Sequence, residues 1–180
     1  MSASDSAEQL EDSAGKAYQL ERWAEAAEGF EAAGDAYATD GNELKAAEMA
    51  NNACVAYLRA GDAVRALHAV DRTVDTFERL GEPKRAAQAL GNLASALEAS
   101  SRVEEAERAY TGAAEKFKAL GDADARADTL KALSQMQLKR GRAIDALTSM
   151  QHGLEGGRKL SLRERFLRWL ARIPIRLMGG

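Results

Sequence analysis

A period of 40 residues runs through most of this 180-residue chain. Glycines, alanines and aromatic residues each recur at this spacing. The residues in register are Gly41, Gly81 and Gly121, then Ala26, Ala66, Ala106 and Ala146, and finally Tyr37, Phe77 and Phe117. A fixed period of this length is typical of stacked helical repeats, in which each unit buries its apolar face on its neighbours.

Apolar residues at helical spacing predict two helices in each period. We expect paired helices at 6–20 and 23–38, 43–60 and 63–80, 83–99 and 103–120, and 123–139 and 143–152. Pro83 stands at a first-turn position, where a proline is tolerated. We expect Ser101 to cap the helix that follows it, with Glu104 completing a capping box. The sequence therefore predicts an all-α protein.

Charge divides the chain into two parts. Residues 1–157 contain 18 Lys and Arg and 27 Asp and Glu, a net charge of −9, whereas residues 158–180 contain seven Lys and Arg and one Glu, a net charge of +6. We therefore predict a helical-repeat domain at 1–157 and a basic tail at 158–180. Such a tail indicates an anionic partner, and nucleic acid is excluded because the acidic body would repel it.

The tail itself is amphipathic when drawn as a helix. Its apolar side contains Leu162, Phe166, Trp169, Leu170 and Ile173, and its basic side contains Arg165, Arg168 and Arg172. This composition is typical of a helix that contacts an anionic membrane surface. It also fits a helix that caps the last repeat, or one that docks on a neighbouring copy of the chain. These three alternatives remain open at the level of sequence.

The residue types that carry chemistry are sparse. Cys54 is the one cysteine, and it falls at a buried helix position, so neither a disulfide nor a cysteine-rich metal site is expected. His68 and His152 lie in different repeats, and the glycines are spread one per turn rather than gathered into a phosphate loop. We expect no catalytic site, no metal and no cofactor.

The acidic N-terminus has no apolar run typical of a signal peptide, and no segment has the 18 apolar residues of a membrane span. The sequence favours a cytoplasmic location, with peripheral membrane contact through the tail.

The turns resemble those of tetratricopeptide repeats. They read Gly61-Asp62-Ala63-Val64-Arg65-Ala66, Ser101-Arg102-Val103-Glu104-Glu105-Ala106 and Gly141-Arg142-Ala143-Ile144-Asp145-Ala146. The 40-residue unit is similar to the longer-repeat type found in Pins/LGN and rapsyn scaffolds and, more distantly, in the NSF-attachment proteins. This resemblance implies a right-handed α-solenoid of about four helical hairpins plus a C-terminal amphipathic helix. It also implies a non-enzymatic adaptor.

In that family the first helices of the hairpins line a concave face that binds an extended or helical peptide. Carried over by position, the partner-binding residues here are Glu48, Asn52, Val55, Arg59, Gln88, Asn92, Ser95, Asp128, Lys131, Gln135 and Lys139. The amides of Asn52 and Asn92 would bond a peptide backbone, or else tie one hairpin to the next. The resemblance implies a protein partner, and a self-assembling oligomer is the alternative.

Overall fold

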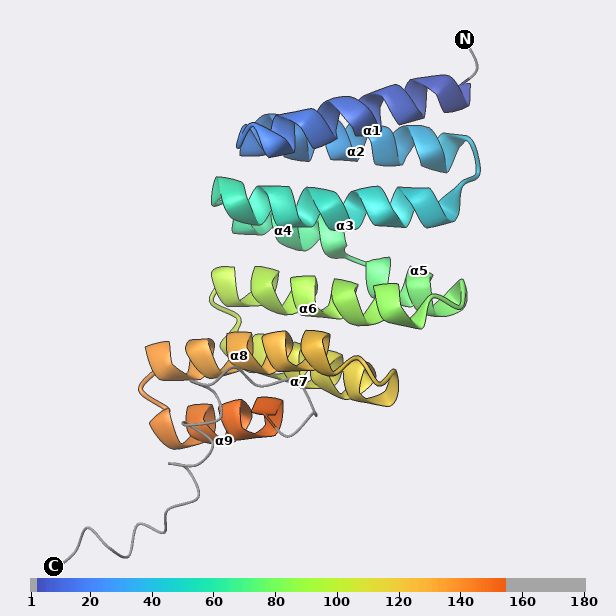
Figure 1. Ribbon diagram of the computed structural model, residues 1–180. Coiled ribbons are helices and arrows are strands. Elements are labelled where there is room, and N and C mark those ends of the chain that lie inside the picture. Colours follow the sequence, from blue (N-terminus) through green and yellow to red (C-terminus); the bar gives the residue numbers. More distant parts are fainter. Residues whose placement is uncertain (1–2, 155–180) are drawn as a thin grey trace, which may run out of the picture. The chain divides into compact units, whose positions relative to one another are not determined.

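The computed structural model describes residues 3–154, and these residues form α-helices joined by short turns (Figure 1). The helices are α1 (Ala3–Gln19), α2 (Trp23–Thr39), α3 (Glu43–Ala60), α4 (Ala63–Val70), α5 (Thr73–Arg79), α6 (Pro83–Ala99), α7 (Val103–Ala119), α8 (Ala123–Lys139) and α9 (Ala143–Leu154). The all-α prediction is confirmed, and the predicted helix ends agree to within a few residues outside the second hairpin. The predicted tail helix lies outside the described residues.

Each turn between helices places one residue at positive φ. Glycines do this at 41, 61, 81, 121 and 141, with φ between 70° and 80°. The amide of the next residue then bonds a carbonyl of the last helical turn, as Asn42 N–H does to the Tyr37 carbonyl at 2.8 Å. Ser101 takes the same place with φ 61°, so the prediction that Ser101 is the N-cap of α7 is wrong. Its backbone ends α6 instead, and its amide donates to the Glu98 carbonyl.

Small residues let the helices approach one another closely. Ala26, Ala66 and Ala106 are fully buried, and Ala146 is 1% exposed. At Gly29 of α2 a Cβ would lie 2.9 Å from the Cβ of Ala14 in α1, closer than carbon atoms pack. The aromatic register fills the remaining space, because Tyr37, Phe77 and Phe117 are all buried. The alanine-rich core expected from the period is therefore present.

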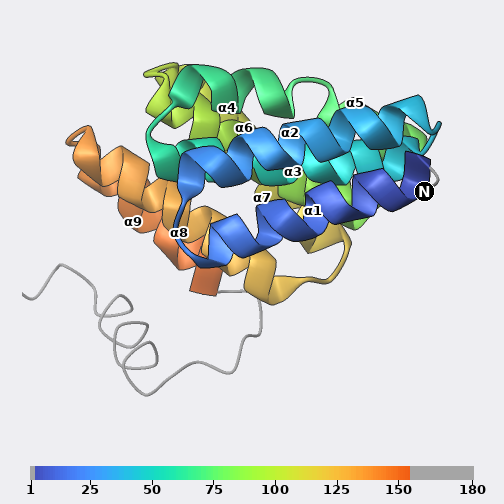
Figure 2. The ribbon, with the colours of Figure 1, turned by 90° about the horizontal axis from the view of Figure 1, so that it is seen from above.

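The second hairpin differs from the prediction of one helix over 63–80. That helix is broken into α4 and α5 at Asp71 and Arg72, where Arg72 has φ 64° (Figure 2). The hydroxyl of Thr73 donates to the Val70 carbonyl at 2.8 Å across the break. α5 then returns to the aromatic register at Phe77.

The cause lies in residues that depart from the repeat. β-Branched Thr73 and Val74 occupy the register of Ala33 and Gly34 in α2, and β-branched residues lower helix propensity. A Cβ at Gly34 would lie 3.4 Å from the Cβ of Met49 in α3, an ordinary contact distance. Val74 brings a larger, half-buried side chain to the same register, and it packs against the cluster of Phe77, Ala86 and Ala89.

The chain forms two compact units, residues 1–116 and residues 117–180, which we call unit 1 and unit 2. Unit 1 contains α1 to α6 and most of α7, and the described part of unit 2 contains α8 and α9. Within unit 1, α1 packs on α2, α3 packs on α2 and α4, and α6 packs on α4 and α5. The predicted boundary at residue 157 lies outside the described residues and stays a prediction.

Candidate functional site

The predicted partner-binding residues of unit 1 form two stripes, which we call the first-helix face. On α3 they recur at intervals of three or four residues from Glu48 to Arg59, and on α6 from Gln88 to Ser95. Such spacing places each stripe on one side of its helix. Arg59 and Gln88 are exposed, and the residues between the stripe ends are half-buried. The side chains of the two stripes are therefore accessible, while the opposite sides of their helices are buried.

A ladder of ion pairs crosses the first helices of unit 1. Lys45 of α3 lies 3.0 Å from Glu11 of α1 and 3.6 Å from Glu48 of its own helix. Glu48 in turn lies 2.8 Å from Arg85 of α6, and Arg85 also pairs with Glu82. Glu48 therefore links two hairpins, which accounts for its charge without any partner.

The two asparagines of the first-helix face differ in their surroundings. The Asn92 amide donates to the side-chain oxygen of Asn51 at 2.9 Å, so Asn92 ties α6 to α3. Ser95 is occupied too, since its hydroxyl contacts the Gly91 carbonyl and the Tyr110 hydroxyl, both at 3.1 Å. Among the described residues, Asn52 has no side-chain hydrogen bond although it is half-buried.

Within the ladder, the carboxylate of Glu11 on α1 connects to side chains of both α2 and α3. It accepts hydrogen bonds from the Tyr37 hydroxyl at 2.6 Å and from Lys45 at 3.0 and 3.2 Å. Burial alone would raise the pKa of Glu11, but the bonds from Tyr37 and Lys45 lower this pKa below its usual value. The same contact raises the pKa of Lys45. The ionised form of Glu11 therefore stabilises the packing of α1, α2 and α3.

Glu11→Gln is expected to lower the free energy of unfolding by about 1 kcal/mol near pH 7, because the charge-assisted bonds are weakened. A carboxyl whose pKa is depressed on folding stabilises the protein above its unfolded pKa and loses this effect as pH falls through its folded pKa. The difference between variant and wild type should therefore begin to shrink near pH 4 and disappear as the pH falls through the lowered pKa of Glu11. Urea melts at several pH values measure it. A difference that persists unchanged at low pH would contradict the assignment.

The four predicted binding residues of unit 2 lie on α8. Asp128, Lys131, Gln135 and Lys139 recur at three- or four-residue intervals and are all exposed. The buried side of α8 faces α9, where the Ser134 hydroxyl donates to the Ala146 carbonyl at 2.8 Å and the Ser149 hydroxyl to the Gln137 side chain at 2.9 Å. This stripe is described for unit 2 alone.

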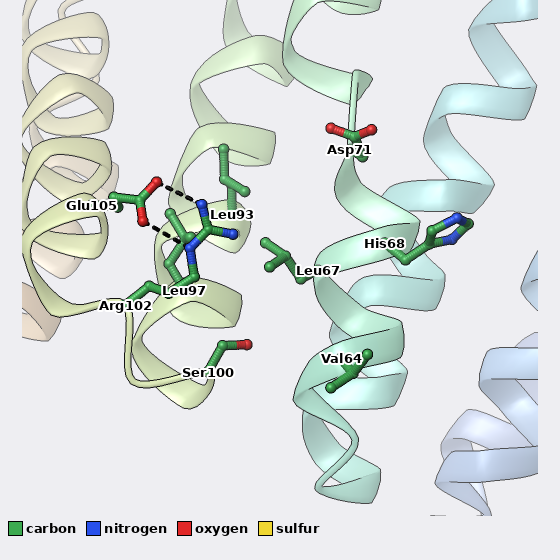
Figure 3. Close-up of a pocket in the computed structure, with 9 residues that line it drawn as sticks. All are labelled: Val64, Leu67, His68, Asp71, Leu93, Leu97, Ser100, Arg102 and Glu105. Carbon is green, nitrogen blue, oxygen red and sulfur yellow. Dashed lines mark hydrogen bonds and ion pairs between the residues drawn. The ribbon is translucent and has the colours of Figure 1, made fainter.

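An apolar groove in unit 1 was not predicted from the sequence (Figure 3). It has a volume of about 560 Å³ and lies between α4, α6 and the start of α7. Leu67 points from α4 toward Leu93 and Leu97 of α6 (Figure 3). Val64 at one end is 78% exposed. The other lining residues are His68, Asp71, Ser100, Arg102 and Glu105.

Residues 40 positions earlier close the equivalent groove on α3. There Arg65 lies 4.6 Å from the centre of the Tyr57 ring and bridges Asp62 at 2.6 Å and Glu28 at 3.3 Å. The Tyr57 hydroxyl also donates to Glu31 at 2.5 Å, and burial together with this carboxylate raises the pKa of Tyr57 to about 12.

In the open groove the register places Leu97 where the closed groove has Tyr57, and Glu105 where it has Arg65. Glu105 is held by Arg102 at 2.6 Å rather than reaching across to α4. The exchange of Tyr and Arg for Leu and Glu is the sequence signal that would have revealed the groove.

Catalytic and metal chemistry find no support in the described part of the chain. No group of three or more His, Cys, Asp or Glu residues there is arranged to hold a metal ion. Cys54 is fully buried, and burial raises the pKa of its thiol to about 12, so it is an unreactive core residue. No helix among residues 3–154 has the length and apolar character needed to cross a bilayer.

The family model described as soluble NSF attachment protein (SNAP) matches residues 2–151. The chain belongs to this family. The match confirms the resemblance to proteins with tetratricopeptide-like helical repeats. Of the three kinds of protein that the sequence resembles, this match supports the resemblance to the NSF-attachment proteins. No curated protein sequence matches this SNAP-family chain significantly.

Two solved structures share the fold of this SNAP-family chain. BtubC (BKLC) from P. vanneervenii has a TM-score of 0.72 at 21% identity, over 83% of this chain and 62% of that one. Aspartyl phosphate phosphatase F from Bacillus subtilis has a TM-score of 0.75 at 14% identity, over 88% of this chain and 42% of that one. The chain thus spans less than two thirds of either structure, and identities this low show the fold alone.

Proposed function

We propose that this SNAP-family chain is a non-enzymatic scaffold whose first-helix face binds an extended or helical segment of a partner protein. Family and fold both indicate a protein-interaction scaffold. The observation that carries the finer proposal is the half-buried amide of Asn52, which has no hydrogen-bond partner among the described residues. An amide with no protein partner keeps its donor and its acceptor available for the backbone of a bound peptide.

The residues of the face have different roles in this proposal. Asn52 offers a donor and an acceptor to the peptide backbone, and Gln88 offers the same pair from α6. Val55 supplies a half-buried apolar contact beside them. Glu48 and Asn92 are engaged with Arg85 and Asn51, so they hold the two helices in place for the ligand.

The proposal is tested with peptides selected from a random phage-displayed library against the full-length protein. The double variant Asn52→Ala/Gln88→Ala is expected to bind the enriched peptides about tenfold more weakly, because two hydrogen bonds of about 0.5–1.5 kcal/mol are lost. Fluorescence anisotropy with labelled peptides measures the affinity. The thermal melt should be unchanged, since neither side chain supports the fold.

Gln19→Ala is the matched control, because Gln19 is an exposed glutamine at the end of α1, outside the face. It should keep full affinity. Peptides that bind the double variant and the wild type equally well would refute the first-helix face as the binding site. Static light scattering tests the alternative of a self-assembling oligomer. A monodisperse monomer would exclude this alternative.

Contact with an anionic membrane through residues 158–180 is a second candidate function, supported by the seven Lys and Arg of that segment against one Glu. The segment lies outside the described residues. We expect the full-length protein to sediment with vesicles of anionic lipid, and high salt to release it. Each Lys or Arg near such a surface contributes about 1 kcal/mol that salt screens. Sedimentation no better than that of the chain truncated after Gly157 would remove this function.

A further inference from the structure

The last described helix, α9, has an open apolar face. Ile144 is 82% exposed, Leu147 60% and Met150 41%, and they recur every three residues along one side of the helix. Another side of α9 is buried on α8 through Ala146, Ser149 and Gly153. α9 thus has one covered face and one uncovered face, both made of residues that suit a packed interior.

The repeat register shows what normally covers the Met150 end of this face, whereas Ile144 shares its register with Val64, which is 78% exposed. The residues equivalent to Met150 are Phe30, Val70 and Tyr110, which are 7%, 1% and 4% exposed. Phe30 and Val70 belong to second helices that pack on the first helix of the next hairpin, as α2 does on α3 and α4 does on α6. Position 150 is therefore a site that a following first helix would bury.

The chain continues for 26 residues after Leu154, and this segment contains the next first-helix register. Adding 40 to the bounds of α8 gives residues 163–179, and Leu160 continues the series of Leu80 and Leu120. Phe166, Leu167, Trp169, Leu170 and Ile173 fall at the positions of Ala86, Ala87, Ala89, Leu90 and Leu93 in α6. The three alanines there are fully buried and the two leucines half-buried. Large apolar residues thus replace alanines in the helix register that follows α9.

Pro174 limits how far this copy extends. It falls at the position of Ala94, a fully buried residue in the interior of α6. Proline removes a backbone donor and clashes with the preceding helical turn, so a helix in this register ends before it. The apolar positions from Phe166 to Ile173 all precede the proline and span two helical turns, enough to cover Leu147 and Met150.

The charges of the two segments do not favour this docking. The described part of unit 2 contains six Lys and Arg and four Asp and Glu, a net charge of +2, while residues 158–180 have +6. Two positive segments do not attract one another electrostatically. The association must come from apolar burial, which salt does not weaken, and Arg165, Arg168 and Arg172 would remain on the outside.

We propose that residues 158–180 form a truncated fifth first helix, whose apolar side docks on the open face of α9 within the same chain. Phe166, Trp169 and Leu170 would cover Leu147 and Met150. The docked segment would cover the open apolar face of α9 and leave its own arginines exposed.

Trp169 provides the test, because the chain has two tryptophans and Trp23→Phe leaves Trp169 as the single reporter. In this background the full-length protein is expected to show the blue-shifted emission of a buried indole, unchanged by high salt and by protein concentration. Adding Leu147→Asp should shift the emission to that of an exposed indole. Val64→Asp is the control, since Val64 is an apolar residue 78% exposed in unit 1, and it should leave the emission unchanged.

Cross-linking gives a second readout that does not depend on a destabilising change. With Leu147→Cys and Trp169→Cys, oxidation should form an intramolecular disulfide, because the buried Cys54 thiol does not compete. Asp145→Cys with Trp169→Cys is the control, since Asp145 is exposed and lies two residues from Leu147 on nearly the opposite side of α9.

Four results would overturn the proposal. The first is Trp169 emission typical of an exposed indole in the Trp23→Phe protein, and the second is a shift with Val64→Asp as large as that with Leu147→Asp. The third is a blue shift of Trp169 that appears only with anionic vesicles. The fourth is a blue shift or cross-link that forms only between two copies at high protein concentration. The third would assign the segment to a membrane, and the fourth to a neighbouring chain.

Discussion

Replacing Phe77 with alanine is expected to lower the free energy of unfolding by about 3–5 kcal/mol, the usual cost of emptying a large aromatic site in a core. Phe77 is 1% exposed and packs with Ala47 of α3 and with Ala86 and Ala89 of α6. It belongs to α5, which has seven residues and is too short to be stable without tertiary contacts. Urea denaturation followed by circular dichroism measures the loss.

Phe77→Leu is the graded control for this experiment. Leucine keeps most of the apolar volume, so its cost should be well below that of alanine. Hydrogen exchange should show the amides of α5 losing protection first in the alanine variant, because the anchor of that helix has gone. A loss below about 1 kcal/mol for Phe77→Ala would mean that α5 is held by something other than its aromatic residue.

Enlarging the register alanine of α7, by Ala106→Leu, is expected to cost about 1–3 kcal/mol through overpacking. Ala106 is fully buried, in the same register as the fully buried Ala26 and Ala66, so a larger side chain there has to displace its neighbours. Helix propensity cannot explain such a loss, because leucine and alanine are both good helix formers. A thermal melt reports the change.

Ala32→Leu tests the same substitution where there is space. Ala32 is exposed in the middle of α2, so the larger side chain should leave the melting temperature nearly unchanged. If Ala106→Leu melted like the wild type as well, the register alanines would not be the points of close helix approach.

The fold was predictable from the sequence because its information is local and repeated. The 40-residue period repeats an alanine, an aromatic residue and usually a turn glycine at fixed positions. Each copy of the period therefore predicts the same pair of helices independently. The break between α4 and α5 was not predicted. It coincides with β-branched Thr73 and Val74, and their effect on helix propensity is too small to predict a break from the sequence alone.

The candidate site was less predictable, because its residues are distinguished by their partners rather than by their types. Asn52 and Asn92 occupy the same register and look identical in the sequence. Only the structure shows that Asn92 bonds Asn51 while Asn52 has no such bond within the described residues. The open groove on α6 likewise became visible only beside its closed counterpart, where Arg65 lies over Tyr57.

The break at Arg72 also marks where the polypeptide can be divided. Arg72 is exposed, and a cut between Asp71 and Arg72 keeps the bond from the Asp71 amide to His68 in one piece and the bond from the Thr76 amide to Arg72 in the other. α4 would stay with the N-terminal piece yet packs on α6, and α5 would stay with the C-terminal piece yet packs on α3. Each fragment would therefore carry a helix that packs on both fragments, and such a shared interface is what a split-protein reporter requires.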